Sequence, residues 1–171
     1  MIPWTLNDIE GALRASWAGD TCSPDDLERA GWRPDNPAWG HCDISALVLH
    51  DLLGGDLVLG DVHIHGNPHG YHWWNRLADG TEIDLTREQF RDGQVITSPR
   101  VVVRPPGPPA RRNREYELLR ERVSARLGQL PPRIGVGGPD ASGPDASGPD
   151  ASGPDASEPD ASGPDASGPG G

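Results

Sequence analysis

The sequence predicts an α+β fold: N-terminal helices, a central buried helix packed on a small antiparallel sheet, and a C-terminal helix that packs on the rest. Two observations support this prediction. Helical patterns come first, strand patterns follow and one more helical pattern comes later, an order typical of α+β domains. Within the strand region, Asp79-Gly80 stands between two apolar stretches and is a strong signal for an antiparallel hairpin.

Two helices are predicted near the N-terminus. Thr5 is a suitable cap, and apolar residues at fourfold spacing after it predict an amphipathic helix over residues 6–18. Ser23-Pro24 followed by two acids starts a second, short helix, which Gly31 ends. Residues 32–41 contain too many prolines and glycines for regular structure and predict a loop.

The next segment, residues 42–53, places apolar side chains around nearly the whole helical circumference, which indicates a buried helix. Gly54-Gly55 ends it. Alternating patterns then predict strands over residues 57–65, 71–77, 81–85 and 95–103. One apolar stripe over residues 111–127 predicts the packing helix, which Gly128 closes.

The C-terminal part is a different kind of polymer. From Gly138 the chain repeats Gly-Pro-Asp-Ala-Ser with one Glu158 variant, and this tail contains no aromatic residue and no Leu, Ile or Val. Such a composition cannot bury a core. We therefore expect one folded domain, residues 1–134, and a disordered low-complexity tail, residues 135–171.

The charge balance excludes some classes of partner. The chain has 15 basic against 26 acidic side chains, and seven of the acids lie in the tail, which leaves 15 basic against 19 acidic in residues 1–137. This mild acidity argues against a general nucleic-acid or anionic-membrane binder. The chain has no long apolar run and only two cysteines, so we expect a cytoplasmic protein with free thiols and no membrane partner. The sequence indicates no particular oligomeric state.

The main chemical clue is a cluster of reactive side chains. All six histidines lie between His41 and His72, and Cys42 stands in the same stretch, at the predicted start of the central helix. Unpaired N–H groups and the helix dipole favour a thiolate at that place. The backbone N–H groups of Cys42 and Asp43 are also suited to stabilising an oxyanion.

Asp84 lies on the hairpin partner of the strand that carries His72. A two-residue turn at Asp79-Gly80 pairs Ala78 with Thr81 and places Asp84 opposite Asn75. His72 is then three residues away from that position, which is roughly 10 Å at the rise of a strand. A direct contact between His72 and Asp84 needs a bulge, a longer loop or strong twist, and Asn75 is the alternative partner of Asp84.

Three segments of the chain resemble the small uncharacterised bacterial YunG-like proteins, and the resemblance covers most of residues 4–130. The segments are Asn36 to His41 with Cys42 and the following Ser45 to Val48, then Gly70 to Leu77, and then Glu82 to Phe90. More distantly, the chain order of a cysteine at a helix start, a histidine on a strand and an aspartate on the next strand is similar to papain-like and transglutaminase-like enzymes.

This second resemblance implies thiol-dependent acyl chemistry by an amidase, peptidase, deamidase or acyl transferase. It implies that Cys42 is the nucleophile, His72 the general base and Asp84, or Asn75, the residue that orients the histidine. The thiolate would attack an amide or peptide carbonyl, that of a protein included, and water or an amine would resolve the thioester. YunG-like proteins commonly have Gln before the cysteine, whereas His41 stands here, so no oxyanion-hole role is carried over to that position.

A structural interpretation competes at each of these positions. Trp39, Trp73 and Trp74 are next to the proposed nucleophile and base, and they either line a substrate cleft, with Asn75 near them, or fill a small core. His72 and Asp84 also fit ordinary structural roles on a strand and in a hairpin. We interpret Cys22 as structural or inert.

A metal site is the first alternative function. His63, His65, His69 and His72 lie within ten positions, and His63 and His65 share one face of a strand, which suits zinc or another transition metal. The spacing matches no standard zinc pattern, and His69 lies in a turn-rich segment. In this case Cys42 would be a ligand, whereas the acyl chemistry needs no cofactor.

The second alternative is a binding module that keeps the fold without catalysis. Replacing Cys42 by Ala would leave binding nearly intact and would abolish an enzyme activity.

Overall fold

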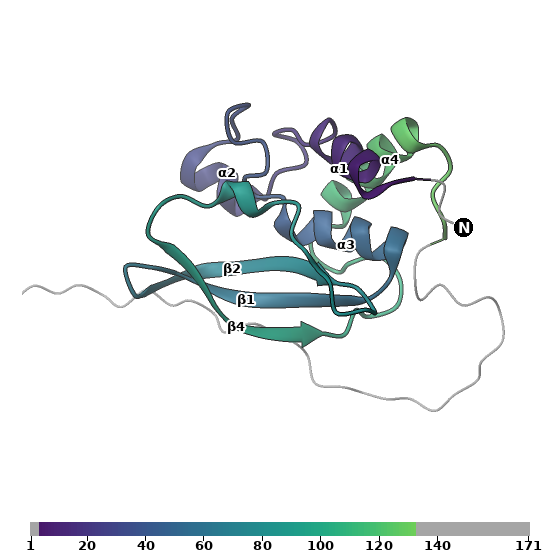
Figure 1. Ribbon diagram of the computed structural model, residues 1–171. Coiled ribbons are helices and arrows are strands. Elements are labelled where there is room, and N and C mark those ends of the chain that lie inside the picture. Colours follow the sequence, from purple (N-terminus) through teal and green to yellow (C-terminus); the bar gives the residue numbers. More distant parts are fainter. Residues whose placement is uncertain (1–3, 133–171) are drawn as a thin grey trace, which may run out of the picture. The chain divides into compact units, whose positions relative to one another are not determined.

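The computed structural model describes residues 4–132, and the predicted tail lies outside them. The described helices are α1 (Leu6–Arg14), α2 (Pro24–Ala30), α3 (Cys42–Leu53) and α4 (Asn113–Leu127), with a short 3₁₀ turn, η1 (Arg87–Gln89). The described strands are β1 (Asp56–Ile64), β2 (Asn67–Arg76), β3 (Glu82–Ile83) and β4 (Gln94–Val102). This order of elements confirms the α+β class (Figure 1).

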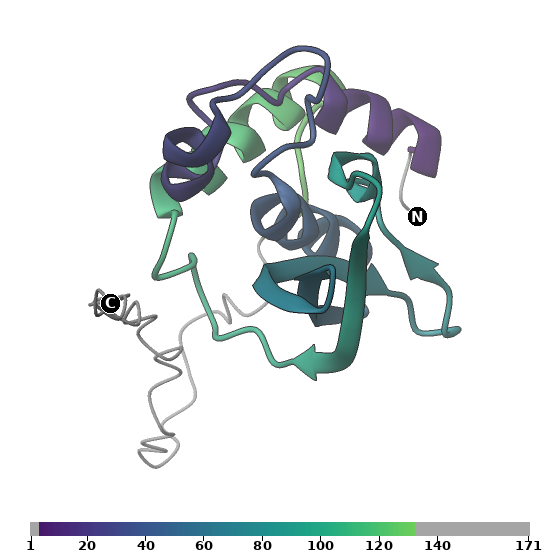
Figure 2. The same cartoon turned by 90° about the vertical axis from the view of Figure 1, so that its left-hand side faces the viewer.

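Helix α3 lies between the sheet and the pair of helices α1 and α4, as both views of the fold show (Figures 1 and 2). Its residues Ile44, Val48 and Leu49 are at most 2% exposed. They belong to one apolar cluster with residues of α1 and α4, among them Leu13 and Leu119. The prediction that this helix is buried because it is apolar all round is therefore confirmed.

The four strands form one antiparallel sheet in the order β3-β2-β1-β4. Strand β2 begins four residues earlier than predicted, so His69 lies in a strand and not in a loop. Strand β3 is shorter than predicted, because the chain leaves the sheet directly after Ile83. Both differences bear on the candidate site, which lies along β2.

The register between β2 and β3 differs from the prediction by one residue. Asn75 pairs with Ile83, so its predicted position opposite Asp84 is wrong. The reason is the turn: the Leu77 N–H donates to the Thr81 carbonyl at 2.8 Å, so this hydrogen bond closes a turn of three residues and not of the expected two.

Helix α1 ends at Arg14, whereas the sequence pattern predicted helix to residue 18. The predicted cap is present, because Thr5 forms a capping box with Asp8. Trp17 leaves the helix but stays buried, and its indole N–H donates to Ser45 Oγ of α3 at 2.9 Å. The fourfold spacing therefore identified a buried face that continues past the end of the helix.

A buried ion pair joins α3 to the segment after β4. Asp51, whose side chain is inaccessible, accepts a hydrogen bond from Arg104 at 2.5 Å, and Arg104 is only 6% exposed. The Tyr116 hydroxyl of α4 donates to the other oxygen of Asp51, and Arg120 lies 3.6 Å from that oxygen. These contacts connect α3 and α4 through one carboxylate.

None of the helices in the described part has the length and apolar character that crossing a bilayer requires.

Candidate functional site

The structure brings His72 and Asp84 into direct contact. His72 Nε2 lies 2.8 Å from Asp84 Oδ2. The contact forms because β3 ends at Ile83, so Asp84 is free of the ladder and turns back toward β2. The Thr86 N–H and hydroxyl fix the carboxylate by donating to Asp84 Oδ1 at 3.2 and 3.3 Å. No bulge in β2 is needed at this point.

The second ring nitrogen of His72 is also occupied. The side-chain amide of Gln89 lies 3.0 Å from His72 Nδ1 and donates to it, which leaves the ring proton on Nε2, where it is donated to Asp84. The imidazole is fully buried, Trp74 stacks on it at 5.8 Å, and Phe90 meets it edge-on at 4.6 Å. Asp84 thus orients the His72 ring through Nε2, and Gln89 caps its other nitrogen.

Cys42 is the first residue of α3 and is half-buried. Burial, and after it the neighbouring Asp43 carboxylate, raises the pKa of its thiol to about 12, while a hydrogen bond from the Trp73 backbone acts in the opposite direction. The helix start predicted a thiolate, but removal from water outweighs the helix dipole here. In this state Cys42 is a protonated thiol.

The proposed oxyanion donors are partly used by a neighbouring side chain. The Asp43 carboxylate accepts the Ile44 N–H at 2.8 Å and also its own backbone N–H. It forms an ion pair with Arg112, whose other nitrogen donates to the Thr21 carbonyl at 2.8 Å. Burial raises the pKa of Asp43, and Arg112 opposes that shift. The N–H of Asp43 is therefore not open to a ligand in this state.

Cys42 lines a cleft of about 220 Å³ together with Trp39, Trp73, Gln89 and Phe90. Two of the tryptophans predicted to bind substrate thus border the same cavity as the predicted nucleophile. The cleft therefore has a thiol, two indoles and the amides of Gln89 and Gln94 at its surface.

The two other residues predicted to bind substrate are largely buried beside this cleft. Trp74 is 8% exposed and packs under His72. Asn75 is 2% exposed and its amide donates to the Ala46 carbonyl at 3.0 Å, which ties β2 to α3. Neither of them lines the larger Cys42 cleft, but both border a second, much smaller cavity of about 10 Å³ together with Cys42.

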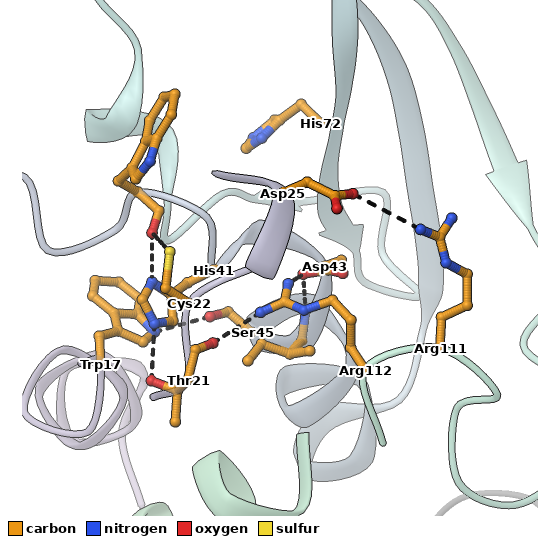
Figure 3. Close-up of polar contacts among 12 residues, drawn as sticks. Trp17, Thr21, Cys22, Asp25, His41, Asp43, Ser45, His72, Arg111 and Arg112 are labelled. Atoms are coloured by element: carbon orange, nitrogen blue, oxygen red, sulfur yellow. Dashed lines mark hydrogen bonds and ion pairs between the residues drawn. The ribbon is translucent and has the colours of Figure 1, made fainter. Parts of the chain in front are cut away.

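Among the described residues the ring nitrogens of His72 bind Asp84 and Gln89 and not Cys42. In Figure 3 no dashed line joins His72 to the other side chains drawn. Gln89 is the residue that links the two parts: it binds His72 and also lines the cleft that contains Cys42. Sequence reasoning missed it, since no spacing rule connects Gln89 to a strand residue 17 positions earlier.

His41 faces the interior and not a ligand site (Figure 3). Its Nδ1 donates to the Trp39 carbonyl at 2.8 Å and its Nε2 lies 2.9 Å from Thr21 Oγ1. Burial lowers the pKa of His41 to about 4. Cys22 lies in the same region, where its thiol donates to the Trp39 carbonyl at 3.3 Å and burial raises its pKa to about 11. Both residues have structural partners.

The buried neutral His41 predicts a pH dependence of stability. Its pKa falls from 6.5 to about 4 on folding, so its contribution is complete above pH 6.5 and is lost as the pH falls from 6.5 toward 4. We expect the wild type to lose about 2 kcal/mol more than His41→Gln between neutral pH and a pH near 4.5, measured by urea unfolding. His69→Gln, at an exposed position, should behave like the wild type. Equal losses in wild type and His41→Gln would contradict the assignment.

The histidines of the metal alternative do not converge. Among residues 4–132 no three His, Cys, Asp or Glu side chains are arranged to hold a metal ion. His63 Nδ1 lies 3.5 Å from the Gly66 carbonyl, and His65 occupies a turn at a φ of 50°. His69 borders the Cys42 cleft. No observation on these residues favours zinc.

Comparison with known proteins gives the family of this chain. A family described as "YunG protein" matches residues 5–128. The chain is 27% identical over 86 residues to "Uncharacterized protein YunG" of Bacillus subtilis (strain 168), an alignment that covers 50% of this chain and 64% of that protein, so the chain spans less than two thirds of the relative's length. No solved structure matches, and the papain-like and transglutaminase-like similarity stays a prediction. The match over most of the described domain shows that this chain belongs to the YunG family.

Proposed function

We propose that the protein carries out thiol-dependent acyl chemistry on an amide or peptide, with Cys42 as nucleophile, His72 as general base and Asp84 as the residue that orients the base. The observation that carries this proposal is the place of Gln89. It caps the free lone pair of the oriented His72 and at the same time lines the cleft that contains Cys42. In this proposal, displacement of the Gln89 side chain frees Nδ1 of His72 for proton transfer.

The reaction begins when a ligand occupies the cleft and displaces the Gln89 amide from His72. The freed Nδ1 takes the proton of the Cys42 thiol, and Asp84 stabilises the resulting imidazolium through Nε2. The thiolate attacks the carbonyl carbon, the C–N bond breaks, and His72 returns the proton to the leaving amine. Water or an amine then attacks the thioester and releases the Cys42 thiol.

The raised pKa of Cys42 is consistent with this sequence of steps. A thiol with a pKa of about 12 is almost entirely protonated at neutral pH, so in the unoccupied cleft it reacts only slowly with alkylating and oxidising agents. An imidazolium close to the sulfur lowers the pKa of the thiol, because an opposite charge favours the thiolate.

The chain order also supports the proposal. A cysteine at the start of α3, a histidine on β2 and an aspartate directly after β3 follow one another as in papain-like and transglutaminase-like enzymes. The ring orientation fits the same roles, because the aspartate binds one nitrogen and leaves the other for proton transfer.

The test is the formation of an acyl-enzyme. The protein is incubated with p-nitrophenyl acetate at neutral pH, and the acetylated peptide is located by mass spectrometry. We expect acetyl on Cys42, a burst of p-nitrophenolate and slow regeneration of the thiol, all absent in Cys42→Ala and retained in Cys22→Ala. Acetylation of Cys42 no faster than that of Cys22 would reject the proposal.

The second candidate is a binding module with an inert thiol. It is favoured by the occupied nitrogens of His72 and by the high pKa of Cys42. A binding module predicts no acetylation of Cys42 above the level of Cys22, so the same experiment separates the two functions.

A further inference from the structure

Part of the edge of β2 that faces β3 is unpaired. Strand β3 pairs only with Asn75 and Arg76, although β2 extends back to Asn67. Within residues 4–132 no strand pairs with this edge at Trp73 or Tyr71. An edge with free main-chain groups is able to accept one more strand.

The hydrogen-bond pattern shows which residues face outward. Partners alternate along an antiparallel strand, so every second residue directs its N–H and C=O to the same side. The Leu77 N–H donates to Thr81 on the β3 side at 2.8 Å, which assigns Asn75, Trp73 and Tyr71 to that side as well. The hydrogen bond from the Trp73 backbone to Cys42 independently supports this assignment, because Cys42 lies outside the β1–β2 ladder.

This outer edge lies in the Cys42 cleft. Tyr71 and Trp73 line the cavity together with Cys42. Tyr71 is 55% exposed, and among the described residues its N–H and C=O have no hydrogen-bond partner. In the cleft, Tyr71 therefore offers a ligand one main-chain donor and one main-chain acceptor. Tyr71 is two residues before Trp73, whose backbone lies next to the Cys42 thiol.

We infer that the substrate is an extended peptide segment that pairs with the N–H and C=O of Tyr71 as an added strand. Two residues of a strand span roughly 7 Å, which is the separation of Tyr71 from Trp73 along β2. A peptide paired at Tyr71 therefore directs its next carbonyls toward Trp73 and Cys42. The reaction of that carbonyl rests on the proposed function, whereas the pairing itself does not.

The probe is acetyl-Ala-Ala-Ala chloromethyl ketone, since alanine side chains test main-chain pairing alone. In the labelling step the Cys42 thiol gives up its proton to solvent and the sulfur displaces chloride, so the S–H and C–Cl bonds break and a C–S bond forms. Tyr71→Pro removes the outward N–H without removing a bond of the β1–β2 ladder, and proline is tolerated on such an edge. Tyr71→Ala is the matched control, because it removes the phenol ring and keeps the N–H.

We expect the peptide reagent to label Cys42 about tenfold more slowly in Tyr71→Pro than in Tyr71→Ala. This factor corresponds to the loss of one main-chain hydrogen bond to the peptide. Labelling by iodoacetamide, which has no peptide to pair, should be equal in the two variants. Both variants should melt at the temperature of the wild type. Equal labelling by the peptide reagent would overturn the inference.

A second measurement separates this inference from the chemistry. In Cys42→Ala, acetyl-Ala-Ala-Ala-amide should shift the Tyr71 amide resonance and slow its hydrogen exchange, whether or not the thiol is a nucleophile. An unchanged Tyr71 resonance at millimolar peptide would reject strand pairing. A shifted resonance together with an unreactive Cys42 in the wild type would reject only the proposed acyl chemistry.

Discussion

Asp51→Ala is expected to lower the free energy of unfolding by about 4 kcal/mol. The substitution removes the carboxylate that Arg104 binds at 2.5 Å, while the Arg104 guanidinium stays 6% exposed. A buried charge that loses its partner keeps its full desolvation penalty, which is why breaking such a pair has a larger effect than the pair contributes. The substitution also weakens the packing of α3 against α4, because the Tyr116 hydroxyl of α4 donates to the same carboxylate.

The measurement is urea unfolding followed by circular dichroism. Asp56→Ala is the matched control: Asp56 also pairs with an arginine, Arg76, at 3.0 Å, but its side chain is 47% exposed. An exposed pair of this kind contributes at most about 1 kcal/mol. An equal decrease in the free energy of unfolding in the two variants would show that the Asp51–Arg104 pair stabilises the fold no more than an exposed pair does.

Gln89→Ala is expected to speed the alkylation of Cys42 by iodoacetamide at neutral pH by at least roughly tenfold. The substitution removes the amide that caps Nδ1 of His72, and the freed nitrogen can take the thiol proton, which raises the fraction of thiolate. Cys22 in the same sample is the internal reference, because burial keeps its pKa near 11.

Gln94→Ala is the control for a change in access. Gln94 also lines the cleft, but its side chain accepts a hydrogen bond from the Arg91 N–H and does not bind His72. Its removal should leave the alkylation rate nearly unchanged, and adding His72→Ala to Gln89→Ala should remove the gain. A similar gain in both glutamine variants would mean that access, and not the base, limits the reaction of Cys42.

Most elements of the fold follow from local pattern. Helix α3 was predictable to the residue, because its apolar side chains cover the whole circumference and Gly54 stops it. The ends of α1 and β3 were not, since they depend on tertiary contacts. Trp17 bonds Ser45 across the core, and Asp84 leaves its strand to bind His72.

The candidate site was predictable in its residue types but not in its connections. A one-residue change in the hairpin turn decides whether Asp84 faces Asn75 or reaches His72, and the two-residue turn expected from Asp79-Gly80 gave the wrong register. Gln89 had no signal of its own, because its role arises from a loop that returns to β2. The protonated state of Cys42 depends on burial, which a helix-start pattern does not report.

The central claim is that His72 activates Cys42. The most direct measurement is the rate of Cys42 acetylation by p-nitrophenyl acetate in wild type and His72→Ala, with Cys22→Ala in both backgrounds so that one thiol is followed. Loss of a positioned general base predicts a rate roughly a hundredfold lower in His72→Ala. Rates within a factor of about two of each other would contradict the account, since general-base catalysis contributes far more than that.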